Sequence, residues 1–550
     1  MSQTFDTAQL HLFDLKDRQV LVLGLGDSGV AMARWAARQG ARVRVVDTRS
    51  ADGTDLPQLQ ALRAQAGGIE YAAGPTWSER WLDGIDLLAW SPGLSIERGE
   101  SARFHALARE RGVTVAGELE LFAQALADLR ESGYRPKVIA VTGTNGKTTA
   151  AALAAHLCRG AGLAAVAAGN IGPAMLDALA AAIDADTLPQ AWVLELSSFQ
   201  LALSQGFAPD AATILNVSED HLDWHATMDS YVAAKQRIYG PGTVAVFDRG
   251  DAATAPRRAA AAALARGSNV AARDAELQAQ RPARRAGDVR AAGDAGGLRT
   301  GTPAPIGFGA DAPPAAGDFG LIRDGTLAWL AQAVAEDEVP AGRRRREPAA
   351  FSVRRLMPAD ALRIRGLHNQ LNALAALALC SAIGVPMAKM LHALRDYAGE
   401  PHRCQLLAVI DGVEYYDDSK GTNVGATIAA LRGLGRRCRL IAGGDGKGQD
   451  FAPLAAPVRE HAAAVYLIGR DAPLLRAALQ AAPVPLVDCA SLEEAVARAA
   501  ADARSGEAVL LSPACASLDM FRNYAHRAEV FAQAVRGIAD ARGVVTETRC

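Results

Sequence analysis

Short apolar runs alternate with helical stretches in three separate parts of this 550-residue chain. Residues 19–24 read Gln-Val-Leu-Val-Leu-Gly, which is typical of a buried parallel strand, and the helical stretch that follows ends at Gly40. The same pattern predicts strands at residues 137–142 and 439–442 in the other two parts. Further strands are expected at residues 42–47, 85–90, 192–196, 212–215, 244–247, 465–468 and 508–511. Because strands that alternate with helices form parallel, doubly wound sheets, we expect an α/β protein.

Length and pattern together divide the chain into three domains. A chain of 550 residues is too long for one hydrophobic core. We assign residues 1–130 to a Rossmann-like N-terminal domain, 131–398 to a central domain and 399–550 to a Rossmann-like C-terminal domain. Within the central domain, residues 255–302 and 341–350 are rich in Ala, Arg, Gly and Pro and lack apolar periodicity. Such segments bury too little apolar surface to fold, so we expect disordered insertions there.

Charge and cysteine usage exclude several classes of protein. Lys plus Arg is 58 against Asp plus Glu at 60, so no overall field attracts nucleic acid or an anionic membrane. The seven cysteines are scattered without a C-x-x-C spacing, which excludes the usual zinc sites and argues for a reducing compartment. The start of the chain lacks the pattern of a signal peptide, and no apolar run could span a bilayer. We therefore expect a cytoplasmic protein without membrane insertion.

A glycine-rich loop follows the predicted strand at 137–142 and precedes a predicted helix. Residues 141–149 read Val-Thr-Gly-Thr-Asn-Gly-Lys-Thr-Thr, although Val141 stands where the strict phosphate-loop motif has its first glycine. In this position backbone N–H groups and the helix dipole attract phosphate. Lys147 can reach the terminal phosphates and the Thr148 hydroxyl can bind Mg²⁺. The loop favours nucleotide binding over an ordinary turn, and the central domain is expected to be like a P-loop NTPase.

A second glycine-rich turn lies in the N-terminal domain. Residues 24–29 fit G-x-G-x-x-G, and Asp47 ends the next predicted strand, as in NAD-binding domains. The same turn can hold any diphosphate at a helix N-terminus, including uridine diphosphate, and the glycines can also serve packing alone. An NAD-dependent oxidoreductase therefore remains an alternative, disfavoured by the phosphate loop and the metal candidates that follow.

Three side chains downstream of the phosphate loop are candidates for catalysis or metal binding. Glu195 ends a buried strand at the carboxyl edge of a parallel sheet, where a carboxylate without a role would be costly to bury. His221 lies in a polar cluster after the next strand and is either functional or an ordinary loop histidine. Lys235 shares a helical face with Tyr231, so it either extends its ammonium to water or is chemically modified.

The order of these motifs resembles the Mur ligases of peptidoglycan synthesis, over nearly the whole chain outside the insertions. The resemblance is carried by Gly-Thr-Asn-Gly-Lys-Thr, Leu-Glu-Leu-Ser-Ser-Phe-Gln, Asn-x-x-x-Asp-His, Ala-Ala-Lys-x-Arg-Ile-Tyr, Leu367-His-Asn369, Pro401-His-Arg403, Asp418-Ser-Lys420-Gly-Thr422-Asn, Gly443-Gly-Asp-Gly-Lys447 and Leu511-Ser-Pro-Ala-Cys-Ala-Ser517-Leu-Asp-Met-Phe521. Within the family, Leu-Ser-Ser-Phe-Gln and Ser-Pro-Ala-Cys-Ala-Ser are similar to the members that add D-glutamate.

The resemblance implies an ATP-dependent ligase with two Mg²⁺ ions, which joins D-glutamate to UDP-N-acetylmuramoyl-L-alanine through an acyl phosphate and works as a monomer. It places Ser28, Asp47, Thr48, Arg49, Gly93 and Asn170 on the UDP-substrate. It places Gly143, Thr144, Asn145, Gly146, Lys147, Thr148, Thr149, Asn369, Arg403 and Asp418 on ATP. It assigns one cation to Thr148 and Glu195 and the other to His221 and a carbamylated Lys235.

On the acceptor side, the resemblance places Thr422, Lys447, Ser517 and Tyr524 around D-glutamate. Tyr524 stands where the family pattern has Phe, which adds a hydroxyl near the acceptor. Lys147, Lys235, His221 and Lys420 are the expected catalytic residues, with His221 a weak candidate for the base that deprotonates the amine. Two alternatives stay open besides the oxidoreductase: a related ligase that adds another amino acid or extends folate, and a non-catalytic nucleotide-binding module.

Overall fold

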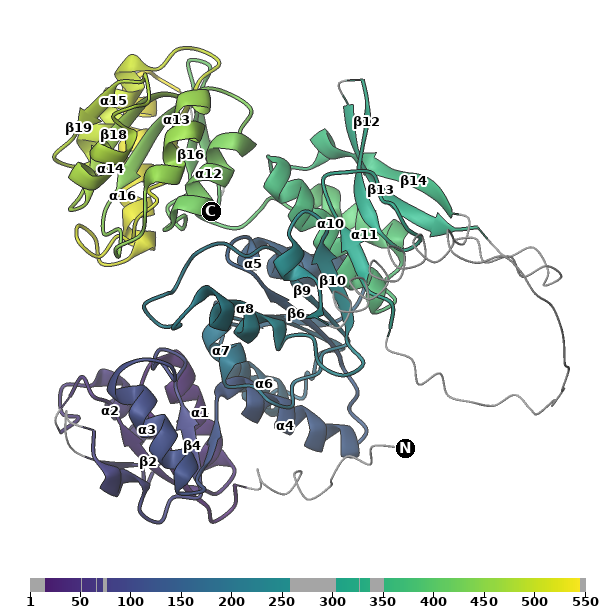
Figure 1. The fold of residues 1–550 in the computed structure, drawn as a ribbon, viewed down its shortest axis with the longest axis vertical. Coiled ribbons are helices and arrows are strands. Elements are labelled where there is room, and N and C mark those ends of the chain that lie inside the picture. Colours follow the sequence, from purple (N-terminus) through teal and green to yellow (C-terminus); the bar gives the residue numbers. More distant parts are fainter. Residues whose placement is uncertain are drawn as a thin grey trace, which may run out of the picture.

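Three α/β units follow one another along the chain in the computed structural model, as Figure 1 shows from the N-terminal unit at the bottom to the C-terminal unit at the top. The structure describes residues 15–50, 52–65, 67–72, 77–257, 303–325, 327–336 and 351–544. The expected disordered segment at 341–350 lies outside these residues, and so does the one at 255–302 apart from residues 255–257.

The N-terminal unit contains a five-stranded parallel sheet in the order β3-β2-β1-β4-β5. Its strands are β1 (Gln19–Leu23), β2 (Arg42–Val46), β3 (Glu70–Tyr71), β4 (Leu87–Trp90) and β5 (Thr114–Ala116), and its helices are α1 (Asp27–Arg38), α2 (Pro57–Gln65), α3 (Gly99–Glu110) and α4 (Glu118–Glu131). Strands β1 and β4 are almost wholly buried because both faces of the sheet are covered. The chain leaves β1 and β4 at the same edge, where parallel α/β sheets bind ligands.

The central unit contains a six-stranded parallel sheet in the order β11-β10-β9-β6-β8-β7. Its strands are β6 (Lys137–Thr142), β7 (Ala165–Gly169), β8 (Ala191–Glu195), β9 (Ala211–Ile214), β10 (Val244–Asp248) and β11 (Ile306–Phe308). Its helices are α5 (Lys147–Gly160), α6 (Met175–Asp184), α7 (Ser198–Ala202), α8 (Met228–Gln236), α10 (Leu367–Ala382) and α11 (Met387–Asp396). The apolar residues of α10 and α5 share one core with the sheet, so α10 holds the helix that begins at the phosphate loop.

The C-terminal unit contains a six-stranded sheet in the order β15-β16-β20-β17-β18-β19, parallel except for the edge strand β15. Its strands are β15 (Gln405–Ile410), β16 (Val413–Asp417), β17 (Cys438–Gly443), β18 (Ala462–Ile468), β19 (Leu486–Asp488) and β20 (Ala508–Leu511). Its helices are α12 (Val424–Gly433), α13 (Ala455–His461), α14 (Ala472–Leu479), α15 (Leu492–Asp502) and α16 (Tyr524–Ala541), and a separate apolar cluster covers each face.

The expected α/β class and the expected strands are confirmed, with ends that differ by a few residues. The sequence pattern missed a small antiparallel sheet that lies beside the central unit in Figure 1. It consists of β12 (Phe319–Asp324), β13 (Leu327–Ala335) and β14 (Phe351–Pro358). Strand β14 is largely exposed and carries two arginines, so it lacks the apolar pattern of a buried strand.

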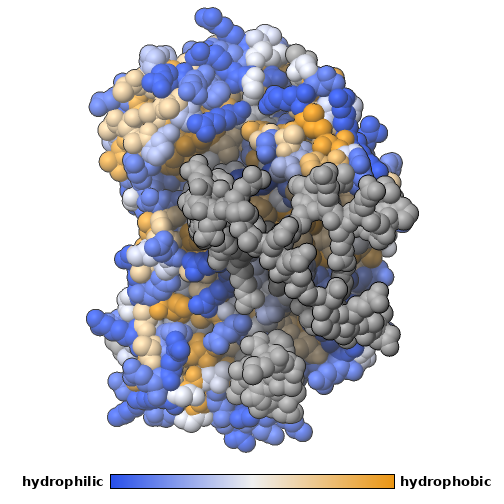
Figure 2. All heavy atoms as spheres, turned by 45° about the vertical axis from the view of Figure 1, so that its right-hand side comes forward, coloured by the Kyte–Doolittle hydropathy of each residue, from blue (hydrophilic) through white to orange (hydrophobic). Residues whose placement is uncertain are grey.

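Hydrophobic side chains are interrupted by hydrophilic ones over the face drawn in Figure 2. Among the helices in the described part of the chain, none combines the length and apolar character needed to cross a bilayer.

Candidate active site

The phosphate loop connects β6 to α5 and depends on two glycines with positive φ. Gly143 has a φ of 151° and Gly146 a φ of 82°, conformations that residues with a Cβ rarely adopt. A Cβ on Gly146 would also lie only 2.6 Å from Oδ1 of Asn372. The loop therefore turns tightly enough to direct its N–H groups toward a bound phosphate. Thr148 and Thr149 follow in the first turn of α5, and both are buried.

Lys147 folds back over this loop. Its Nζ donates hydrogen bonds to the carbonyl oxygens of Gly143, at 2.9 Å, and Thr144, at 2.8 Å. Burial lowers the pKa of Lys147, while the nearby Glu195 opposes that change. A phosphate group placed on the loop would lie beside this ammonium.

The segment after β9 forms hydrogen bonds with the phosphate loop. Asn216 accepts a hydrogen bond from the Asn145 N–H at 2.9 Å and donates one to the Asn145 carbonyl at 3.0 Å. Thr144 Oγ1 lies 3.0 Å from the Tyr231 hydroxyl and accepts from the Ser218 N–H at 3.0 Å. Asn216 and Tyr231 were not predicted as site residues, although Asn216 begins the Asn-x-x-x-Asp-His motif and Tyr231 was placed on the helical face of Lys235.

Glu195 and Thr148 lie at the same edge of the central sheet, because β6 and β8 are neighbours. Glu195 is 4 % exposed and accepts a hydrogen bond from Asn170 Nδ2 at 3.0 Å. Thr148 Oγ1 lies 3.5 Å from Nη2 of Arg403, which reaches it from the C-terminal unit. A carboxylate and a hydroxyl beside a phosphate loop are oxygen ligands of the kind that Mg²⁺ takes, so these residues fit one cation.

Lys235 is fully enclosed close to the phosphate loop. Its side chain is 1 % exposed, its Nζ donates to the Gly143 carbonyl at 2.9 Å, and it lies 4.4 Å from the centre of the Tyr231 ring. Burial, and then the charge of Lys147, lower the pKa of Lys235 well below its usual value. A buried amine of this kind loses its proton readily and is then nucleophilic, which fits carbamylation and not a lysine that extends to water.

His221 lies in the turn between β9 and α8 with a positive φ of 56°. Its Nε2 is 3.6 Å from Oδ2 of Asp220 and its ring packs against Phe199, with ring centres 4.8 Å apart. Burial lowers the pKa of His221, and the charges of Lys147 and Lys235 act in the same direction. His221 therefore follows the segment whose Asn216 and Ser218 contact the phosphate loop, and its ring is favoured in the neutral form.

No group of three or more His, Cys, Asp or Glu side chains that could hold a metal ion occurs in the described part of the chain. The two predicted cation sites contain one such side chain each, Glu195 and His221. Any cation there would need further oxygen ligands, for which Thr148, a carbamate on Lys235 and nucleotide phosphates are the candidates.

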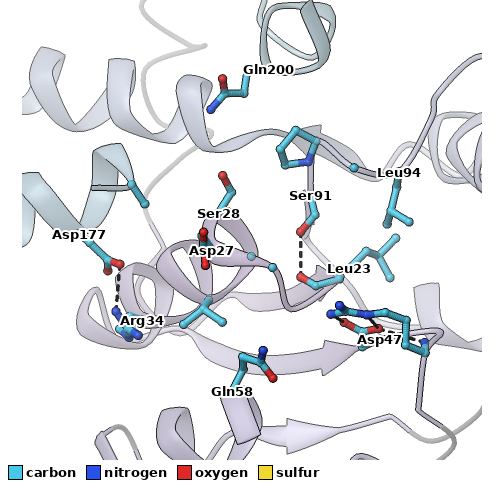
Figure 3. Close-up of a pocket in the computed structure, with 18 of the residues that line it drawn as sticks. Leu23, Asp27, Ser28, Arg34, Asp47, Gln58, Ser91, Leu94, Asp177 and Gln200 are labelled. Atoms are coloured by element: carbon cyan, nitrogen blue, oxygen red, sulfur yellow. Dashed lines mark hydrogen bonds and ion pairs between the residues drawn. The ribbon is translucent and has the colours of Figure 1, made fainter. Parts of the chain in front are cut away.

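A cavity of about 770 Å³ lies between the N-terminal and central units. All six residues predicted to contact the UDP-substrate line it: Ser28, Asp47, Thr48, Arg49, Gly93 and Asn170. We call this cavity the donor pocket, after the predicted donor substrate. Figure 3 shows Asp47 at one end of it and the ion pair of Arg34 and Asp177, at 2.9 Å, at the other. Gln200 lines it from the central unit; the sequence analysis quoted Gln200 in a motif but did not assign it to the site.

Hydrogen bonds within the protein hold the Asp47 carboxylate in place. It accepts hydrogen bonds from the Leu25 N–H at 2.7 Å and from Nε and Nη2 of Arg49 at 2.8 and 2.6 Å. Burial alone would raise the pKa of Asp47, but these hydrogen bonds outweigh it and the pKa is lowered. Arg49 therefore holds the Asp47 carboxylate in an ion pair at the wall of the pocket.

Asn369 and Asp418 occupy buried positions that their hydrogen bonds fix. Asn369 Nδ2 donates to the Arg365 carbonyl at 2.8 Å, and its Oδ1 accepts from Asn372, the residue that packs on Gly146. Asp418 accepts a hydrogen bond from Ser512 Oγ at 2.7 Å, and burial raises its pKa to about 6. Asn369 therefore lies beside the phosphate loop, and Asp418 belongs to a loop of the C-terminal unit.

Three of the four predicted acceptor residues lie on loops that follow three neighbouring strands of the C-terminal sheet, which we call the acceptor loops, and Tyr524 begins α16. Strands β16, β20 and β17 are adjacent, and their carboxyl ends lead to Thr422, Ser517 and Lys447 respectively. Gln449 joins the loops, because its Oε1 accepts from the Val424 N–H at 2.9 Å and its Nε2 donates to the Ala514 carbonyl at 2.8 Å.

Lys420 and Tyr524 meet at this group of loops. Lys420 Nζ lies 5.5 Å from the centre of the Tyr524 ring. Burial lowers the pKa of Lys420 to about 8, Arg403 adds to this effect and Glu195 opposes it. Asn423 Nδ2 donates to Asn145 Oδ1 at 3.2 Å, which connects the acceptor loops to the phosphate loop.

Arg527 is a further residue of this region that the sequence did not reveal. It is fully buried and donates to the carbonyls of Ser419, at 2.8 Å, and Cys515, at 3.1 Å. These bonds hold two of the acceptor loops against α16. The residue type alone does not predict such burial, because arginine is usually exposed.

Comparisons with known proteins give family-model matches in each of the three units. Residues 18–117 match the family model of the Mur ligase MurD-like N-terminal domain, residues 141–279 the Mur ligase middle domain, and residues 402–515 the Mur ligase glutamate ligase domain. The chain is 55% identical over 539 residues to a UDP-N-acetylmuramoylalanine–D-glutamate ligase from Burkholderia mallei and to another from Burkholderia thailandensis, covering 96% of this chain and 99% of each relative.

Among solved structures, a UDP-N-acetylmuramate–alanine ligase from Thermotoga maritima is similar with a TM-score of 0.50 and 17% identity, over 95% of this chain and 99% of that chain. At this identity the likeness concerns the fold.

Proposed function

Because the chain belongs to the Mur ligase family, we propose that it is an ATP-dependent ligase that adds D-glutamate to UDP-N-acetylmuramoyl-L-alanine in peptidoglycan precursor synthesis. One contact carries the proposal in the structure. Asn170 lines the donor pocket and also donates a hydrogen bond to Glu195 beside the phosphate loop. The carboxylate to be activated and the phosphoryl group that activates it would therefore meet at this point.

The reaction needs an activated carboxylate, because a carboxylate oxygen is a poor leaving group. An oxygen of the alanyl carboxylate attacks the γ-phosphorus of ATP, ADP leaves, and an acyl phosphate forms. The amine of D-glutamate then attacks the acyl carbon and phosphate leaves with that oxygen. Lys147 and the loop N–H groups hold the transferred phosphoryl group, and Lys420 lies where it can neutralise the same charge from the acceptor side.

We assign the cation ligands as two sets. Thr148 and Glu195 would hold one Mg²⁺, and His221 with a carbamate on Lys235 would hold the other. These cations would neutralise charge on the phosphates during transfer. A carbamate forms when the neutral Lys235 amine attacks carbon dioxide and releases a proton, and the low pKa of this buried amine favours that reaction.

The domain assignment follows the three sites. Residues 1–130 bind the UDP-substrate, residues 131–398 bind ATP, and residues 399–550 bind D-glutamate. We further propose that the enzyme acts as a monomer in the cytoplasm, which sedimentation of the purified protein and cell fractionation would test.

The ligase activity is tested with purified protein, Mg²⁺, ATP and UDP-N-acetylmuramoyl-L-alanine. Release of ADP and phosphate is expected only when D-glutamate is also present, with a product heavier than the donor by one glutamyl residue. Replacing D-glutamate with L-glutamate, L-alanine or diaminopimelate is expected to give no product. Product formation with one of these acceptors but not with D-glutamate would contradict the assignment.

A further inference from the structure

The loop that follows β4 in the N-terminal unit forms several hydrogen bonds to a short segment of the central unit. Residues 92–98 contact residues 224–226, and we call this contact the 92–98 clamp. Trp224 Nε1 donates to the Pro92 carbonyl at 3.0 Å, and Ser95 Oγ donates to the Trp224 carbonyl at 2.6 Å. The first of these bonds holds the indole ring, and the second holds the backbone of the same residue.

Two charged side chains of the loop complete the clamp. Glu97 Oε2 accepts from the Ala226 N–H at 2.7 Å. Arg98 donates from Nε to the His225 carbonyl at 3.2 Å and from Nη2 to the Ala226 carbonyl at 3.0 Å. Because these bonds reach main-chain atoms, they fix the path of the gripped segment.

His225 is the buried residue at the centre of the clamp. Its side chain has no exposed surface, with Nδ1 3.4 Å from Glu97 Oε1 and Nε2 2.9 Å from Ser198 Oγ. The ring also packs against Trp224 and Tyr231, at 4.5 and 5.2 Å between ring centres. A neutral imidazole satisfies both contacts when Nδ1–H donates to Glu97 and Nε2 accepts from the Ser198 hydroxyl.

The order Glu97, His225, Ser198 is also that of a hydrolase triad. A nucleophile must be accessible to its substrate, and Ser198 is only 2 % exposed. The three residues therefore serve to join the N-terminal unit to the central unit.

The clamp lies between the donor pocket and the second proposed cation set. Pro92 and its neighbours at 91–94 line the donor pocket. On the other side, the His225 N–H donates to the His221 carbonyl at 2.9 Å, and the gripped segment leads directly into α8, which carries Lys235. Movement of the loop would therefore be transmitted to both His221 and Lys235.

We propose that the 92–98 clamp sets the position of His221 and Lys235 relative to the bound donor, so that Glu97 and His225 are positioning residues of the ligase reaction. This inference rests on the proposed function and adds a link between donor binding and the second cation. Neither residue needs to touch a substrate. Their role is to hold the backbone that carries the two cation ligands.

Cation binding and catalysis in Glu97→Ala test this role. The change removes the acceptor for the Ala226 N–H and leaves a buried histidine without its carboxylate. Mn²⁺ binding is measured by electron paramagnetic resonance in the presence of donor and a non-hydrolysable ATP analogue. Of the two Mn²⁺ ions, the more weakly bound one should bind with an affinity about tenfold lower than in wild type. This is the lower end of the effects seen when a residue that orients a metal ligand is changed. We expect kcat to fall by a similar factor, while the KM for ATP stays within about twofold.

Glu97→Gln is the rescue variant and Glu100→Ala the matched control. The glutamine retains an oxygen for the Ala226 N–H, so its Mn²⁺ binding should stay within about threefold of wild type, as expected when a hydrogen bond to a charged group becomes neutral. Glu100 lies nearby on α3 and pairs with Arg103 at the surface, where such pairs contribute little. Mn²⁺ binding and kcat in Glu100→Ala should equal the wild-type values.

Equal Mn²⁺ binding in Glu97→Ala and Glu100→Ala would overturn the inference. If Glu97→Ala does not fold, Arg98→Ala decides, since it removes two bonds to the segment while Glu97 keeps its contacts with His225 and Ala226. Mn²⁺ binding unchanged from wild type in Arg98→Ala would then overturn the inference. The proposed function fails separately, when the wild-type protein releases no ADP with donor and D-glutamate. The Mn²⁺ titration still reports on the clamp in that case, because it needs no turnover.

Discussion

Two glycine-rich turns in this protein have the same backbone setting and different surroundings. The turn at 24–29 follows β1 and the turn at 143–146 follows β6, and each leads into a helix at the carboxyl edge of a parallel sheet. The helix after the first turn begins with Asp27 and Ser28, whereas the helix after the second begins with Lys147 and Thr148. The glycines leave room for a phosphate at both turns, and both helix starts carry a hydroxyl, but the first start has the acid Asp27 where the second has the cation Lys147.

The side chains that surround the two turns extend this difference. Beside the first turn, Ser28 Oγ donates to the buried Glu118 at 2.6 Å, and burial raises the pKa of Glu118. Beside the second turn lie Glu195 and the buried Lys235. In the proposed function, the first turn would hold a diphosphate that does not react, and the second would hold the phosphoryl group that is transferred. The residues that flank a glycine pattern, and not the pattern itself, separate binding from chemistry.

Removing the Lys147 ammonium of the second turn should have the largest effect on activity. Lys147→Ala is expected to reduce D-glutamate-dependent ADP release about a thousandfold or more, because the residue neutralises charge on the transferred group. Calorimetry should show that UDP-N-acetylmuramoyl-L-alanine still binds as to wild type, because the first turn is untouched. Near-normal turnover would place phosphoryl transfer elsewhere.

Lys235→Ala should have the next largest effect. We expect kcat to fall about a hundredfold, at the upper end of effects on metal sites, since one proposed cation ligand is lost. Added formate or acetate should restore part of the activity by supplying the missing carboxylate oxygens, while chloride should not. Full activity without a carboxylate would exclude a carbamate role.

Gly29→Ala tests the first turn. A Cβ at this position would lie 1.8 Å from the Gly24 carbonyl oxygen, so the turn must shift. Overpacking of this kind costs about 1–3 kcal/mol, and if this cost falls on the donor-bound state, donor binding weakens by about 5- to 150-fold. ATP binding should remain normal, and calorimetry with each substrate checks both expectations. Weakened ATP binding with normal donor binding would reverse the roles of the turns.

The smallest effect concerns pH. Burial lowers the pKa of Lys420 to about 8, so its ammonium is present below that value and is lost as the pH rises through it. We expect kcat to decline above about pH 8, whereas donor binding at the first turn stays constant over the same range. Lys420→Arg should move the decline to higher pH, because arginine keeps its charge. An unchanged profile would show that another group titrates.

The strands and the glycine turns could be predicted because each depends on residues that are close in sequence. The phosphate loop, Glu195 and His221 follow β6, β8 and β9, which are neighbours in the parallel sheet, so these groups leave the sheet at the same edge. The support from Asn372 could not be predicted, because it comes from a helix more than two hundred residues away. The small sheet at β12–β14 was missed because β14 has charged residues where a buried strand would be apolar.

Lys235 shows most clearly what the sequence pattern cannot predict. A lysine on an apolar helical face either reaches water or is buried, and the spacing is the same for both. Its burial depends on Gly143 and Tyr231 lying over its ammonium. Arg527 presents the same difficulty, since its buried bonds to Ser419 and Cys515 become evident only when the acceptor loops are assembled.

The transfer of oxygen from donor to phosphate tests the central claim most directly. The donor is prepared with both oxygens of its alanyl carboxylate replaced by ¹⁸O and is incubated with ATP, Mg²⁺, D-glutamate and the protein. If the phosphoryl group of the second turn is passed to that carboxylate, the released phosphate will contain one ¹⁸O atom per molecule of product, and the new amide will retain the other. Phosphate without ¹⁸O, released together with product, would contradict the account.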